Sequence, residues 1–239
     1  ISARQAALQG LRMWEASIDT DPVLGHYRPQ PAKKSSMKEL GAGITVYLRR
    51  FIAQKQDASL TALAITLASE AGVPLDLATL RRQVTQVEMD PDVRIATLAT
   101  LAQARKPADD ALIFKLLDDP VALVQAAAMR HAFDRKLKGI AKLGLGAVKS
   151  GALPVARSAL AGFAKLEPAT LLNLWTNREE SMSRELWLDA YLALSEAKDI
   201  KTKQAADSFA SSDPNNVFSL SQAGGEVLKG ELVFHNQGA

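Results

Sequence analysis

The sequence predicts an all-α protein, and three observations support this fold class. A helical unit recurs about every 31 residues, and repeats of this length are typical of stacked helices. The 239 residues are 47% hydrophobic but only 5% aromatic, so the core must consist chiefly of Ala and Leu. Apolar and polar residues rarely alternate along the chain, and such alternation is the pattern of a β-strand.

Three copies of the unit carry similar residues in corresponding places. Each copy opens with a pair that contains proline: Asp90-Pro91, Asp119-Pro120 and Leu153-Pro154. Proline is tolerated there because the first amides of a helix have no intrahelical acceptor. A long polar side chain follows in each copy: Arg94, Gln125 and Arg157. Two residues later each copy has an alanine: Ala96, Ala127 and Ala159.

This pattern resembles HEAT repeats. The resemblance implies a HEAT/armadillo-like right-handed α-solenoid, in which helix pairs bury their Ala and Leu faces against neighbouring pairs. Our hypothesis for the shared polar slot is that Arg94 and Arg157 hold the repeat together. Each would bond the carbonyl groups at a helix end or the Asp of a neighbouring unit.

The N-terminal half contains further helical patterns. We expect helices over about 2–17, 36–56, 59–71 and 76–87, before three repeat copies within about 90–166. Ser36 and Glu39 fit a capping box at the start of the second helix. Several prolines lie between residues 19 and 31, and they predict an extended connection because proline disfavours helix at and before its position.

The C-terminal half predicts helices over about 168–177 and 183–197. Four glycines between residues 139 and 151 predict either a helix break or unusually close backbone packing, since an interior glycine costs a helix about 1 kcal/mol. The Ser-, Gly- and Asn-rich sequence from Ser208 onward predicts a looser chain. Gly224-Gly225 predicts a linker. We therefore assign residues 1–223 to the solenoid and residues 224–239 to a linker and the start of a truncated module.

The sequence offers no recognisable catalytic or metal-binding motif. The chain has no Cys, which excludes disulfides and thiolate chemistry, and it has no Gly-x-Ser-x-Gly elbow or phosphate-binding loop. His131 has no second His or carboxylate four residues further on, so a structural role is expected. Three acidic pairs could serve acid–base chemistry in principle: Asp109-Asp110, Asp118-Asp119 and Glu179-Glu180. Two of the three lie at helix starts or ends, where acids are commonly caps and partners of the helix dipole, so catalysis is not expected of them. We predict no enzyme activity, cofactor, metal or membrane span in this segment.

Basic residues are unevenly distributed, although the net charge is only +3 and the isoelectric point about 9.1. One cluster lies between Arg28 and Gln56 and a second between Arg130 and Lys149. Such runs are commonly solvated helix faces, but they also attract phosphate or acidic proteins. The candidate binding patch comprises Arg49, Arg50, Lys138, Lys142 and Lys149. A nucleic-acid-binding solenoid using these patches is therefore the alternative function.

Two segments resemble parts of a bacterial multidomain family. Residues 14–29, which include Asp21-Pro22-Val23-Leu24-Gly25-His26-Tyr27-Arg28-Pro29, resemble a turn in the HEAT region of large planctomycete-like and verrucomicrobium-like proteins. Those proteins combine a sugar-dehydrogenase-like β-propeller, HEAT repeats and a c-type cytochrome domain. Residues 224–234 are similar to the helix that leads into the haem-attachment motif of that family.

The family resemblance implies a spacer function in a periplasmic or membrane-associated setting. The chain lacks the Cys-x-x-Cys-His motif, so haem c would belong to a missing C-terminal module. The apolar first helix and the start at Ile1 predict that more protein precedes this segment. We therefore expect a non-catalytic scaffold whose partners are proteins or other domains of the same polypeptide.

Overall fold

A computed structural model describes residues 3–12, 37–53, 57–213 and 215–221, and every regular element among them is helical. The prediction of an all-α fold is therefore confirmed for these residues. The helices form two compact units, residues 1–112 and residues 113–239. Trp14 to Pro29, Ser36 and residues 224–239 lie outside the described part, and so do the features predicted for them.

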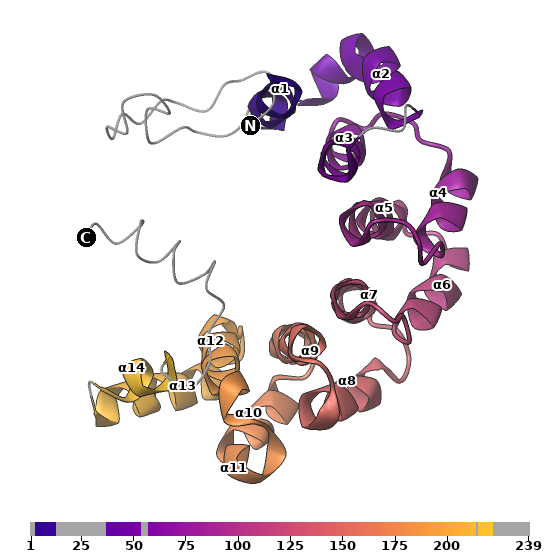
Figure 1. Ribbon diagram of the computed structural model, residues 1–239. Coiled ribbons are helices and arrows are strands. Elements are labelled where there is room, and N and C mark those ends of the chain that lie inside the picture. The colour runs from indigo at the N-terminus through magenta and orange to yellow at the C-terminus, as the bar shows by residue number, and fades with distance from the viewer. Residues whose placement is uncertain (1–2, 13–36, 54–56, 214, 222–239) are drawn as a thin grey trace, which may run out of the picture. The chain divides into compact units, whose positions relative to one another are not determined.

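The first unit has two central helices, which begin at Ala58 and Pro91. It contains α1 (Ala3–Arg12), α2 (Met37–Ala53), α3 (Ala58–Glu70), α4 (Leu77–Val84), α5 (Pro91–Ala104) and the first part of α6 (Ala108–Leu116). Helix α3 packs against α1, α2 and α5, and α4 packs against α5. In Figure 1, α3 and α5 lie next to each other, and α2 and α4 lie along their right-hand side. Leu67 and Ala68 of α3 are completely buried in its core.

The second unit has α9 at its centre. It contains α7 (Ala122–Asp134), α8 (Ile140–Ser150), α9 (Leu153–Leu166), α10 (Pro168–Thr176), α11 (Arg178–Ser181), a 3₁₀ turn η1 (Arg184–Leu186), α12 (Trp187–Glu196), α13 (Ile200–Ser212) and α14 (Asn216–Ser221). Helix α9 contacts α7, α8, α10 and α12. In Figure 1, α7, α9 and α12 lie in one row, and α8 and α10 lie along one side of that row.

The predicted repeat spacing is found in the helices themselves. Helices α5, α7 and α9 begin at Pro91, Ala122 and Leu153, which are 31 residues apart in each step. The predicted first pair is correct, because Asp90 caps α5 and its side chain accepts from the Asp92 amide at 2.9 Å. Arg94 and Gln125 are the fourth residues of their helices, whereas Arg157 is the fifth residue of α9, so the third copy of the slot is displaced by one residue.

The predicted opening of the second copy is wrong by two residues. Helix α7 begins after Val121, so Asp119-Pro120 precedes the helix and does not open it. The reason is local, because the Asp119 side chain accepts from the Val121 amide at 3.0 Å and holds a turn there. In the third copy the pair is displaced the other way, and Pro154 lies at the second position of α9.

Helix ends were predicted less well than helix positions. The helix expected over residues 76–87 ends at Val84. The chain does not loosen at Ser208, because α13 continues to Ser212 and α14 follows. These segments are held by apolar side chains that the Ser-rich composition masks. Ala206 and Leu220 are buried, and the Phe209 ring packs edge-on against Trp175 with 5.0 Å between centroids.

The glycines of α8 produce close packing and no break. Helix α8 runs without interruption from Ile140 to Ser150. A Cβ atom on Gly144 would lie 2.9 Å from the Phe133 ring and 3.0 Å from the Phe163 ring. A Cβ atom on Gly162 of α9 would overlap the Phe133 ring. Phe133 therefore needs glycine on two neighbouring helices.

We predict opposite effects for alanine at two glycines of this unit. Gly162→Ala should lower the free energy of unfolding by about 1–3 kcal/mol, because the buried Phe133 ring must move to admit the new methyl group. Gly146→Ala is the control, since a Cβ atom there would meet no atom within 4 Å. The control should raise stability by about 1 kcal/mol. Urea unfolding of both variants measures the difference, and equal effects would contradict the packing described here.

Candidate interaction surfaces

Arg94 is the most deeply buried charged side chain among the described residues. It has no exposed surface, and its Nε donates to the carbonyl oxygen of Val84 at 2.9 Å. Val84 is the last residue of α4, and the final carbonyls of a helix have no partner within that helix. Arg94 thus joins the start of α5 to the end of α4, which is one of the two contacts that our hypothesis expected.

Arg157 makes the other kind of contact. Its Nε donates to Oδ2 of Asp189 at 2.9 Å, and the two side chains are only 17% and 12% exposed. The bond joins α9 to α12. Gln125 differs from both arginines, because its Nε2 donates to the Asp119 carbonyl at 2.6 Å, just before its own helix. The shared slot therefore has two roles, since the arginines join neighbouring helices and Gln125 closes a local turn.

Several side-chain bonds join residues that are about one repeat apart. In the first unit, Ser69 donates to Gln103, 34 positions away, at 2.7 Å. Arg81 of α4 donates to the buried Asp109 of α6 at 2.6 Å, across 28 residues. In the second unit, Lys165 donates to Asp134 at 3.0 Å across 31 residues. The separations of 28–34 residues are close to the 31-residue step between the starts of α5, α7 and α9.

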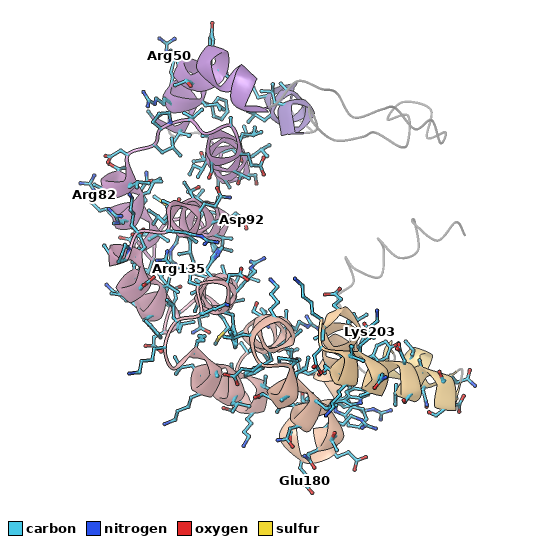
Figure 2. All side chains as sticks on the ribbon, turned by 180° about the vertical axis from the view of Figure 1, so that it is seen from behind. Arg50, Arg82, Asp92, Arg135, Glu180 and Lys203 are labelled. Carbon is cyan, nitrogen blue, oxygen red and sulfur yellow. The ribbon has the colours of Figure 1, made fainter. Side chains whose placement is uncertain are left out.

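The first half of the candidate basic patch lies on α2. Arg49 donates from both Nε and Nη2 to the carbonyl oxygen of Pro74, at 3.0 and 2.6 Å. Arg50 is exposed and projects away from the helix in Figure 2. A groove of about 510 Å³ is lined by residues of α2, α4 and the loop before α4. Arg49 on its wall fastens α2 to that loop.

The second half of the candidate patch lies on and before α8. Lys138, Lys142 and Lys149 are exposed, and all three belong to the second unit. From Arg135 to Leu166 the chain has seven Lys or Arg and no Asp or Glu. Arg49 and Arg50 belong to the first unit. The five residues of the candidate patch thus divide between the two compact units, and their use as one binding patch stays a prediction.

Three aromatic rings surround Arg178, and this cluster was not predicted from the sequence. The centre of the Arg178 guanidinium lies 4.6 Å from the Trp175 ring centroid, 5.2 Å from Trp187 and 5.6 Å from Phe209. A cation over aromatic faces is attracted by the ring quadrupoles. A signal for part of this cluster was present, because Phe209 follows Arg178 by 31 residues. The cluster fastens α13 to α10 and α11.

The described residues considered for acid–base or metal chemistry lie on or between helices from α6 to α11. No group of three His, Asp or Glu side chains that could hold a metal occurs among the described residues. Burial, with the nearby Arg130, lowers the pKa of His131 and favours its neutral form. Asp109 and Asp110 lie in the first turn of α6, but the Asp109 carboxylate accepts from Arg81 of α4. His26 and His235 lie outside the described residues.

Comparison with protein-family models, curated proteins and solved structures gives no match to this chain. Among the described helices, none is both long enough and apolar enough to span a membrane.

We predict that Arg94 contributes strongly to stability. Arg94→Ala should lower the free energy of unfolding by about 3 kcal/mol, because it leaves a cavity and removes the donor from the Val84 carbonyl. The exposed Arg82 of α4 offers a control, and Arg82→Ala should change stability by about 0.5 kcal/mol or less. Thermal and urea unfolding measure both variants. An Arg94→Ala variant as stable as the Arg82→Ala variant would disprove the bridging role.

Proposed function

We propose that this chain is a non-catalytic helical-repeat scaffold that holds protein partners or other domains of its own polypeptide. Its helices would form a HEAT/armadillo-like right-handed solenoid of stacked pairs. The observation that carries the proposal is the set of bonds between residues 28–34 positions apart, such as Arg81 to Asp109 and Arg157 to Asp189. In a solenoid each repeat contacts its neighbours, so contacts at one repeat length are the expected signature.

The use of buried polar groups also supports a scaffold. The Nε of Arg94 donates to the carbonyl oxygen at the end of α4, and Asp109 accepts from Arg81. Both contacts fix neighbouring helices. A rigid stack of helices presents its exposed side chains at fixed distances from one another, which is what a scaffold needs in order to recognise a partner.

The particular role that we propose is a spacer between a dehydrogenase-like module and a cytochrome c-like module. This rests on the resemblance of residues 14–29 and 224–234 to the multidomain bacterial family. Haem c would be held by the missing C-terminal module, and the parent protein would be periplasmic or membrane-associated. Fixed spacing between two such modules would set the distance that electrons travel.

The intact mass and haem absorbance of the polypeptide from its native source test the spacer role. We expect a polypeptide much larger than the 25.7 kDa of this chain, with the Soret band of a covalently attached haem. Haem that stays with the polypeptide under denaturing conditions would show attachment. A colourless polypeptide of 25.7 kDa would contradict the spacer role and leave an independent adaptor.

A further inference from the structure

Helix α8 presents a cationic face with an apolar centre. Lys142, Leu143, Gly146 and Lys149 are all exposed, and we call these four residues the α8 face. They occupy positions i, i+1, i+4 and i+7, which share one side of a helix. Lys142 and Lys149 are two turns apart, or about 10 Å along the axis. Leu143 is 46% exposed and lies beside the line of these two lysines.

The charge around the α8 face is uncompensated along the sequence. No Asp or Glu occurs between residues 135 and 166. Within this stretch Arg157 is bonded to Asp189 and Lys165 is bonded to Asp134. Lys136 and Lys138 are exposed just before α8 and add to the positive potential. Such a surface attracts carboxylates or phosphates.

Gly146 is not required by the packing of the protein itself. A Cβ atom there would meet nothing within 4 Å, whereas one on Gly144 would lie 2.9 Å from Phe133. An exposed glycine inside a helix costs about 1 kcal/mol relative to alanine. Gly146 therefore leaves the backbone open between two lysines at a cost that internal packing does not explain. A partner that approaches this backbone closely would explain it.

We propose that the α8 face docks an acidic amphipathic helix of a protein partner. An apolar side of the partner helix would cover Leu143 and Gly146, while carboxylates seven residues apart would pair with Lys142 and Lys149. This inference rests on the proposed scaffold function and names the chemistry of its partner. Equal spacing of charges on the two helices provides the complementarity.

Three features favour a protein over other polyanions. An apolar centre with a charged rim is the usual anatomy of a protein interface. The α8 face carries no Arg, Asn, Gln or aromatic side chain, which are the groups that read or stack on bases. The apolar side of α8 is already buried through Ile140 and Val148, so this helix has no large apolar face to insert into a membrane.

The test measures binding of a synthetic helical peptide to the full chain by fluorescence anisotropy. The probe is about 20 residues long, which is enough for a stable helix, with Glu at every seventh position beside an Ala and Leu face. We expect salt-sensitive binding that the double variant Lys142→Glu, Lys149→Glu weakens at least about tenfold. The control pair Lys198→Glu, Lys203→Glu makes the same charge change in the same unit. Both control lysines are exposed, and Figure 2 labels Lys203 on α13.

A third variant separates docking from folding. Gly146→Gln should weaken peptide binding about tenfold while leaving the free energy of unfolding the same or higher, because Gln is the better helix former. Binding unaffected by this variant would overturn the proposed close approach. A role limited to folding would instead lower stability together with binding.

Other results would overturn the inference outright. These are no peptide binding at about 50 mM salt, equal binding of a peptide with Gln in place of Glu, and an equal loss in the control pair. Tighter binding of duplex DNA, or of phosphatidylserine-containing vesicles, with the same loss in the α8 variants would assign the face to that partner. A colourless 25.7 kDa polypeptide would remove the spacer role but leave this binding result intact.

Discussion

Close approach of neighbouring helices is the constraint on which the second unit depends, and the Phe133 ring shows how it is met. The ring extends from α7 toward Gly162 of α9 and Gly144 of α8, where a methyl group would not fit. It also meets Phe163 edge-on, with 5.1 Å between ring centroids. One aromatic side chain of α7 thus packs against two other helices, α8 and α9. Protein interiors are densely packed, so removing that space forces the surrounding backbone to move.

Hydrogen bonds from polar side chains also hold neighbouring helices together. Burying a charge is costly unless it is bonded, and the buried arginines meet this requirement at a neighbouring helix. Arg94 reaches the end of α4, and Arg157 reaches Asp189 of α12. Each bond fixes the position of one helix against the next. The same residues that satisfy their own hydrogen bonds therefore also hold successive helices in register.

Much of this organisation could be predicted from the sequence, because it is periodic. The slot occupied by Arg94 and Arg157 is visible in the spacing, and so is the expectation that both residues contact neighbouring elements. The particular acceptors were not visible. Val84 could not be chosen as the acceptor for Arg94 while the preceding helix was expected to run to residue 87. The sequence did not indicate that Gly162 must be glycine, because the space it leaves is filled by Phe133 of another helix.

The candidate binding residues show the same limit more strongly. Charge runs revealed the lysines of α8, but they did not show whether Arg49 and Arg50, which belong to the other compact unit, share a surface with them. Composition also concealed α13, since its many Ser and Lys residues outnumber the few that anchor it, among them Thr202 and Ala206. Distances between distant residues decide such cases, and a single sequence does not contain them.

The central claim is that neighbouring helices stabilise one another through contacts between residues about one repeat apart. Native-state hydrogen exchange on the Gly162→Ala variant tests it most directly, because exchange reports the stability of each helix separately. Nearest-neighbour coupling predicts a loss of amide protection centred on α7, α8 and α9, with α3 and α5 protected as before. A uniform loss of protection across all the described helices would contradict the account.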